Sequence, residues 1–354
     1  MEQFHIIGIM SGTSLDGIDF AEIIFTYNNK WSFELKKCET YAYSKKWSKK
    51  LQTAVNFNEN ELKQLNVDYT NYLAKEINKF ISKNNITNID YLCSHGHTIL
   101  HQPHNGITLQ IGNLPILSQK TKQNIICDFR VSDVQLGGQG APLVPIGDHI
   151  LFSTYNYCIN LGGFSNISFK KENNRIAYDI CAVNVVLNYY AQQLGFNYDN
   201  NGEIARTGKL NLELLEKLNT LEFYKKKPPK SLGIEWVNSN IFPLIEKFNI
   251  PKEDILHTYA QHIGAIIGND LNASAEETIL VTGGGAHHTF LMQCIQKHTN
   301  AKVIIPDISL IEYKEALIFG LLGVLKLKHK NNILSSVTGA HKDHSAGNIF
   351  MYSP

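Results

Sequence analysis

The sequence has no long apolar run, no basic block and no acidic tail. No stretch approaches the 18 or so uninterrupted apolar residues that a membrane-spanning helix needs. The formal net charge is +1 at pH 7, with both signs spread along the chain, which argues against a nucleic-acid-binding protein. The N-terminus, MEQFHIIGIM, becomes polar too quickly for a secretory signal peptide. These absences predict a soluble, globular, cytoplasmic protein without a membrane span.

Recognisable metal and P-loop motifs are also missing. The six cysteines are scattered and form no C-x-x-C pair, so buried reduced thiols are the simplest interpretation. His95, His97, His101 and His104 would share only part of one face of a strand, and no cysteine or carboxylate completes a zinc set. The chain contains no G-x-x-x-x-G-K-[ST] motif, and therefore no Walker lysine.

Glycine is plentiful where the chain first turns. An apolar run over residues 4–9 leads into a turn with three glycines, and a β-prone run over residues 20–27 follows it, which predicts strand, turn and strand. The hydroxyls of Ser11, Thr13 and Ser14 and the exposed N–H groups of such a turn can form an anion site. An ordinary hairpin is the alternative interpretation at this point.

The same pattern begins again near the middle of the chain. A strand predicted over residues 157–161 runs into Gly162–Gly163, and further strands and helices follow as they do after the first turn. With 354 residues and 43% hydrophobic composition, the length favours two domains. We therefore predict α/β domains over residues 1–153 and 154–354, each a βββαβαβα unit. Ligands of such proteins collect at strand carboxyl ends and between domains.

Ten motifs then follow one another along the chain. They are GIMSGTSLDGID (8–19), SHGHT (94–98), LQIGN (109–113), DFRVSDVQLGGQGAPLVP (128–145), NLGGFSNIS (160–168), YDNNGEIARTG (198–208), PPKSLG (228–233), TGGGAHHTFL (282–291), KEALIFGLLG (314–323) and SVTGA (336–340). In this order the sequence resembles the anhydro-N-acetylmuramic acid kinase family, within the actin, hexokinase and heat-shock chaperone ATPase superfamily. The DFR…GGQGAPLVP block is highly specific, whereas a lone GGG is weak.

The resemblance implies a two-domain sugar kinase or actin-like fold with the nucleotide in the inter-domain cleft. It implies an enzyme that uses ATP, Mg²⁺ and water to open the 1,6-anhydro bridge of anhydro-N-acetylmuramic acid and to phosphorylate O6. The product would be N-acetylmuramic acid 6-phosphate, in peptidoglycan recycling. Two alternatives stay open: a related sugar kinase with another substrate, and a non-catalytic actin-like nucleotide-binding regulator. The helix predicted over 314–327 is apolar enough for a core or a homodimer contact.

Two carboxylates are the expected catalytic residues. Asp179, near the end of a predicted strand, would accept a proton from water, although it could instead cap the helix expected to start near Val185. The family commonly has Asp-Thr-Gly-Pro-x-Asn here, whereas this chain has bulkier residues at Ile180–Val183. Glu315 matches a family residue near the anhydrosugar. Its alternative role is to stabilise the N-terminus of a helix beginning at Lys314.

Three further residues are expected to contact the sugar. Arg130 can fork onto a carboxylate, hydroxyl or phosphate, with a surface ion pair to Asp128 or Asp133 as the alternative. His97 stands where the family pattern has Gln, so a sugar contact there is expected to be pH-sensitive. Thr98 follows it directly. Lys230 is expected to be a solvated charge or, alternatively, a contact to a substrate carboxylate.

The resemblance assigns the glycine-rich turns to ATP. Asp16 would in addition hold Mg²⁺ through water. The full set expected to bind ATP is Ser11, Gly12, Thr13, Ser14, Asp16, Gly162, Gly163, Asn166, Gly283, Gly284 and Gly285.

Overall fold

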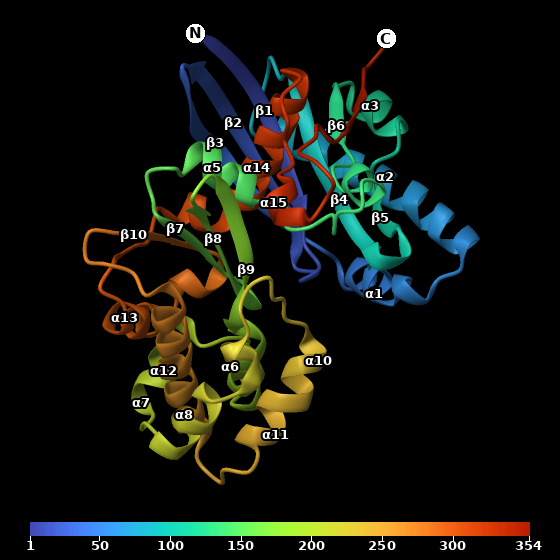
Figure 1. The fold of residues 1–354 in the computed structure, drawn as a ribbon. Coiled ribbons are helices and arrows are strands. Elements are labelled where there is room, and N and C mark those ends of the chain that lie inside the picture. The colour runs from blue at the N-terminus through green and yellow to red at the C-terminus, as the bar shows by residue number, and fades with distance from the viewer. The chain divides into compact units, whose positions relative to one another are not determined.

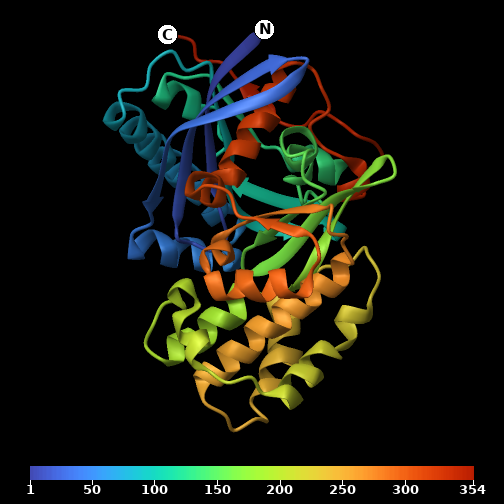
Figure 2. The same cartoon turned by 90° about the vertical axis from the view of Figure 1, so that its left-hand side faces the viewer.

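The computed structural model describes all residues 1–354 and forms two compact units (Figures 1 and 2). The first unit comprises Met1–Leu151 and Tyr313–Pro354, and the second comprises Phe152–Glu312. The first boundary therefore lies close to the division expected after residue 153. Residues 313–354 differ from the expectation, because they group with the first unit and not with the second.

The first unit is built on a seven-stranded sheet. Its strands run in the order β12-β6-β4-β1-β2-β3, and β5 pairs with β4. Strands β1, β2 and β3 are antiparallel neighbours, whereas β4 is parallel to β1 and β6 is parallel to β4. The elements are β1 (Glu2–Ser11), β2 (Gly17–Asn28), β3 (Lys30–Ala42), α1 (Lys45–Thr53), α2 (Glu59–Lys83), β4 (Tyr91–Gln102), β5 (Ile107–Ile111), α3 (Ile116–Thr121), β6 (Ile125–Cys127), α4 (Val131–Gln135), α5 (Pro145–Leu151), α14 (Ile308–Leu327, which begins in the second unit), α15 (Ser335–Thr338) and β12 (Asn348–Phe350).

The second unit repeats this topology. Its five-stranded sheet has the order β11-β10-β7-β8-β9, with β7, β8 and β9 antiparallel and β10 and β11 parallel to their neighbours. The repeat predicted from the sequence pattern is thus confirmed at the level of strand order. The elements are β7 (Tyr157–Leu161), β8 (Phe164–Lys171), β9 (Asn174–Ala182), α6 (Asn184–Gln193), α7 (Glu203–Thr207), α8 (Leu212–Asn219), α9 (Glu222–Lys225), α10 (Ile234–Trp236), α11 (Phe242–Ile245), α12 (Lys252–Leu271), β10 (Thr278–Thr282), α13 (Thr289–His298) and β11 (Lys302–Ile304).

Helices cover the first sheet on both faces. Helix α2 begins with a capping box in which Asn58 and Glu61 satisfy each other's backbone N–H groups, and its apolar stripe packs on Ile7 and Ile9. Helix α14 crosses the other face so closely that a Cβ at Gly8 would collide with the carbonyl of Ala316. A glycine in β1 is therefore required by packing, and this contact fixes α14 against the strand that leads into the first glycine turn.

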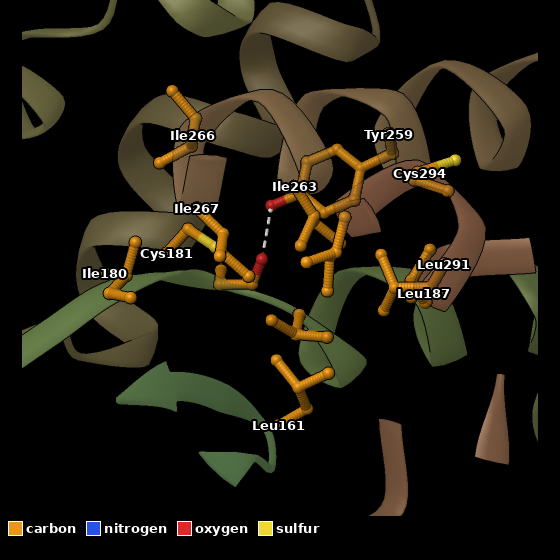
Figure 3. Close-up of a cluster of buried hydrophobic side chains, with 14 of the residues drawn as sticks. Leu161, Ile180, Cys181, Leu187, Tyr259, Ile263, Ile266, Ile267, Leu291 and Cys294 are labelled. Carbon is orange, nitrogen blue, oxygen red and sulfur yellow. Dashed lines mark hydrogen bonds between the residues drawn. The ribbon is translucent and has the colours of Figure 1, made fainter. Parts of the chain in front are cut away.

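The core of the second unit lies between its sheet and helices α6, α12 and α13. Figure 3 shows Ile180 and Cys181 of β9 facing side chains of α12, and the hydroxyl of Tyr259 donating to the carbonyl of Ala182 at 3.1 Å. Residues Ile180–Val183 are all fully buried. Of the residues that depart from the family pattern, Ile180–Ala182 therefore belong to strand β9 and Val183 directly precedes α6, and all of them fill the core of this unit.

Two features at the C-terminal end differ from the sequence-based expectation. Helix α14 begins at Ile308, whereas the expected start was Lys314. The polar segment after it contributes β12, an additional strand that pairs with β6. None of the helices is both long enough and apolar enough to span a membrane.

Candidate functional site

The first glycine turn, residues 12–16, presents an exposed carboxylate and free backbone donors. Asp16 Oδ1 accepts hydrogen bonds from the Ser14 hydroxyl and the Gly17 N–H, both at 2.9 Å, so the second carboxylate oxygen is left free. Thr13 and Ser14 are exposed, and no hydrogen bond is made by their backbone N–H groups. Such a turn can receive an anion, with the carboxylate beside it.

The second glycine turn has the same character. The carbonyls of Gly162 and Gly163 accept hydrogen bonds from the backbone at residues 183–185 and thus face the protein, while the N–H groups of the two glycines are unused. Asn166 is exposed and lies opposite Asp179 in the β8–β9 pairing. The structure therefore brings the second expected phosphate contact next to the expected catalytic base.

Ser11 differs from the other residues of the first turn. It is 2% exposed, and its hydroxyl lies 2.7 Å from His97 Nδ1 and 2.6 Å from the hydroxyl of Tyr43. The side chain expected to contact ATP is therefore already engaged inside the unit, and only its backbone remains for a phosphate. Sequence pattern could not show this, because both partners are remote along the chain.

Three hydroxyls form a buried network beside His97. The hydroxyls of Tyr43 and Tyr69 lie 2.5 Å apart, and the Tyr69 hydroxyl also interacts with that of Ser11. In one arrangement Tyr69 donates to Tyr43, Tyr43 to Ser11 and Ser11 to His97 Nδ1, so that every hydroxyl proton has an acceptor. In this arrangement His97 carries its proton on Nε2.

His97 is not the pH-sensitive contact that the sequence suggested. Burial lowers its pKa to about 4, because the charged imidazolium would lose its hydration. We expect an NMR titration of the His97 ring protons to show no change between pH 5 and pH 8, because the ring stays neutral throughout. A midpoint near the ordinary histidine value of about 6.5 would contradict this assignment.

Arg130 is held by neutral partners and not by a surface ion pair. Its Nε–H donates to His95 Nε2 at 2.8 Å, and its Nη1 donates to the carbonyl of Gly140 at 2.6 Å. Asp128 instead accepts a hydrogen bond from Asn348, and Asp133 accepts hydrogen bonds from Gly140 and Thr338. The alternative of an Arg130–Asp128 or Arg130–Asp133 ion pair is therefore wrong.

Two residues that position Arg130 were missed as site residues. His95 is neutral, because burial and the charge of Arg130 hold its pKa well below the usual value, and its Nδ1–H donates to the carbonyl of Gly96 at 2.9 Å. Asp133 is fully buried and shapes the glycine-rich loop: a Cβ at Gly138 would collide with its carboxylate. His95 lies in the motif SHGHT (94–98), and Asp133 lies in the DFR…GGQGAPLVP block (128–145). These motifs were the only sign in the sequence that the two residues belong to the site.

Glu315 lies near Arg130 and Asp16. It sits well inside α14, which begins at Ile308, so it is not a residue that stabilises a helix N-terminus. Burial raises the pKa of Glu315; the positive charges of Arg130 and Lys314 oppose this rise, and the negative charge of Asp16 adds to it. Two other expected site residues of the first unit, Arg130 and Asp16, are thus within electrostatic reach of Glu315.

Thr98 adjoins a second buried polar group. Its hydroxyl accepts a hydrogen bond from Gln110 Nε2 at 3.3 Å. Gln110 is 6% exposed, and its Oε1 is buried without a partner. An unpaired buried acceptor is rare in proteins, and it can be satisfied by a hydroxyl of a ligand. Gln110 therefore joins Thr98 as a candidate sugar contact that sequence reasoning did not single out.

Asp179 is held on one side only. Its Oδ2 accepts the N–H of Leu232 at 2.9 Å, and Oδ1 has no partner. It is not a helix cap, because α6 begins at Asn184 and is preceded by Val183 without a side-chain cap. Burial raises the pKa of Asp179, while the bond from Leu232 opposes this rise. A half-buried carboxylate with one free oxygen and a raised pKa suits a general base.

The three glycines after β10 are not equivalent. A Cβ at Gly283 would lie 2.5 Å from Asn160 Oδ1, and one at Gly285 would lie 2.7 Å from Leu161 Cβ. Both glycines are therefore required by packing within the unit. Gly284 is exposed, and a Cβ there would meet nothing closer than 3.8 Å, so it is the glycine best placed to face a ligand.

Comparison with known proteins gives consistent matches along the whole chain. A family model described as anhydro-N-acetylmuramic acid kinase matches residues 4–352. A protein of that name from Sulfurimonas denitrificans is 30% identical over 372 residues, which cover 99% of this chain and 100% of the relative. Another from Mannheimia succiniciproducens is 32% identical over 381 residues, covering 99% of each.

Solved structures resemble the chain more distantly. The (R)-2-hydroxyglutaryl-CoA dehydratase component A of Acidaminococcus fermentans matches with a TM-score of 0.48 and 13% identity, covering 90% of this chain and 96% of that one. This likeness is too weak to carry an inference about function.

Proposed function

The chain belongs to the anhydro-N-acetylmuramic acid kinase family, and from this premise we propose that it opens the 1,6-anhydro bridge of anhydro-N-acetylmuramic acid and phosphorylates O6 at the expense of ATP. The product would be N-acetylmuramic acid 6-phosphate, which serves peptidoglycan recycling in the cytoplasm. The observation that carries the proposal is Asp179, a half-buried carboxylate with one oxygen free and the other held by a backbone donor.

In this proposal Asp179 is the general base. Its free Oδ1 accepts a proton from water, the water oxygen bonds to C1, and the C1–O6 bond breaks. The departing O6 then bonds to the γ-phosphorus, and ADP leaves. The raised pKa of Asp179 helps it to accept the proton, provided that the carboxyl is still ionised at the working pH. Positioning and charge stabilisation account for most of the catalysis in phosphoryl transfer.

The first unit supplies the proposed sugar contacts. Arg130 presents a guanidinium fixed by His95 and Gly140, and His97 presents a neutral imidazole. Thr98 and Glu315 complete the set. Arg130 remains charged at neutral pH, since burial lowers its pKa only to about 10. A guanidinium fixed in this way suits a carboxylate such as the lactyl group of a muramic acid.

The exposed N–H groups at Thr13, Ser14, Gly162 and Gly163 are the proposed phosphate contacts, and Gly284 is the proposed adenosine contact. Mg²⁺ fits beside Asp16, because one oxygen of that exposed carboxylate is free. No group of three or more His, Cys, Asp or Glu side chains could hold a metal by itself, which suits an ion held chiefly by phosphate and water. When bound, Mg²⁺ would neutralise phosphate charge.

Product analysis tests the proposal. Incubation of the protein with ATP, Mg²⁺ and anhydro-N-acetylmuramic acid is expected to give equal amounts of ADP and the sugar 6-phosphate. A panel of other sugars separates the family substrate from the alternative of a different sugar. Nucleotide binding without phosphorylation of any sugar in the panel would favour the non-catalytic, actin-like regulator. Gel filtration would test the possible homodimer.

A further inference from the structure

A buried ion pair adjoins Asp179 in the second unit. Lys230 Nζ lies 3.1 Å from Asp270 Oδ1, and the two side chains are 3% and 16% exposed. The hydroxyl of Tyr178 donates to Asp270 Oδ2 at 2.7 Å, so both oxygens of this carboxylate are engaged. The ammonium group also lies 5.4 Å from the ring centroids of Tyr178 and Phe223. Lys230 is therefore neither a solvated charge nor available to a substrate carboxylate.

The loop that carries Lys230 holds Asp179 at two points. The Asp179 N–H donates to the carbonyl of Lys230 at 3.1 Å, and the Leu232 N–H donates to Asp179 Oδ2 at 2.9 Å. Residues 230–232 belong to no helix or strand, so the position of their backbone depends on side-chain anchors. Lys230 is the buried anchor, two residues from the donor that Asp179 uses.

A buried ion pair contributes little net stability, because desolvation of both charges offsets their attraction. It does restrict geometry, since the ammonium must meet one carboxylate between two rings. We propose that Lys230 and Asp270, with Tyr178, position the Asp179 carboxylate by fixing the backbone of residues 230–232. The Leu232 N–H then holds one oxygen and leaves the other free for water. The inference rests on the proposed role of Asp179 as the base.

The variant to test is the double substitution Lys230→Met and Asp270→Asn. It removes both charges together, so neither is left buried and unpaired, and it conserves side-chain volume. Leu218→Ala is the matched control, because Leu218 is fully buried in the core of the same unit and no hydrogen bond joins it to Asp179 or to residues 230–232. Thermal melting of both variants tests whether they are folded and measures how far each substitution lowers the melting temperature.

Hydrogen exchange tests the geometry without any substrate. We expect the Leu232 amide to exchange about tenfold faster or more in the double variant than in the unaltered protein, and about as slowly in Leu218→Ala as in the unaltered protein. Unchanged exchange at Leu232 in the double variant would overturn the proposal. This result stands whether or not the protein phosphorylates the sugar.

Kinetics test the consequence for catalysis. A displaced base of this kind costs about 10- to 100-fold in kcat, with the KM of the sugar unchanged, while Leu218→Ala keeps kcat. Lys230→Arg, which retains the charge, is expected to lose less than the double variant. If kcat of the double variant falls no further than that of Leu218→Ala, the ion pair is merely structural. If the unaltered protein forms no product, the proposed function fails, and the exchange result alone decides the positioning.

Discussion

Replacement of Asp179 with Asn is expected to lower kcat by about 10³-fold, within the range usual for loss of a general base. Asparagine keeps the size of the side chain and can still accept the N–H of Leu232, so the local structure should be retained. What it loses is the ability to take a proton from water. Initial rates of sugar 6-phosphate formation, measured at saturating ATP and sugar, give the effect directly.

The control is Glu276→Gln, which removes one carboxylate from an exposed position of the same unit. It should leave kcat unchanged. Activity of Asp179→Asn within a few-fold of the unaltered protein would remove Asp179 from the mechanism. If neither the unaltered protein nor Asp179→Asn phosphorylates a sugar, and both still bind nucleotide, the alternative of an actin-like regulator gains support.

Replacement of Arg130 with Lys is expected to lower kcat/KM for the sugar by about 10²-fold. Lysine keeps the positive charge, but a single ammonium cannot meet His95 Nε2 and the Gly140 carbonyl as the guanidinium does. Hydrogen bonds from a charged donor contribute about 1.5–3 kcal/mol each, and each 1.4 kcal/mol corresponds to a tenfold change. The measurement is steady-state kinetics with the sugar varied at saturating ATP.

Arg206→Lys is the matched control for this substitution. Arg206 is exposed and donates to Gln293 and Thr289 within the second unit. Its replacement should leave kcat/KM for the sugar unaltered. Equal, small effects of the two substitutions would show that Arg130 acts only as a diffuse charge.

The repeated strands could be predicted because their signals are local. Strands β1 and β7 are short apolar runs that end in glycine turns, and both were placed correctly from the sequence pattern. Family motifs then indicated Asp179, Arg130 and Glu315. In the structure these residues show, respectively, one free carboxylate oxygen, a guanidinium fixed by hydrogen bonds, and a carboxylate within electrostatic reach of that guanidinium.

The remaining features depend on partners that lie far apart along the chain. The sequence predicts that the Ser11 side chain binds phosphate, whereas in the structure its hydroxyl is hydrogen-bonded to His97, 86 residues away along the chain. The sequence predicts a solvated side chain for Lys230, whereas in the structure it is buried and forms an ion pair with Asp270, 40 residues further along the chain. The start of α14 was also misplaced, because the six residues from Ile308 to Tyr313 include polar side chains that interrupt the apolar run. Periodicity reports burial, but it does not report which buried groups meet.

The central claim is that one reaction both adds water at C1 and phosphorylates O6. The most direct measurement is the reaction of anhydro-N-acetylmuramic acid with ATP and Mg²⁺ in ¹⁸O-labelled water, followed by mass spectrometry of the sugar product. We predict a 6-phosphate that carries one ¹⁸O atom at C1, with none in the transferred phosphoryl group. A phosphorylated sugar without the label at C1, or labelled phosphate with an unopened anhydrosugar, would contradict the account.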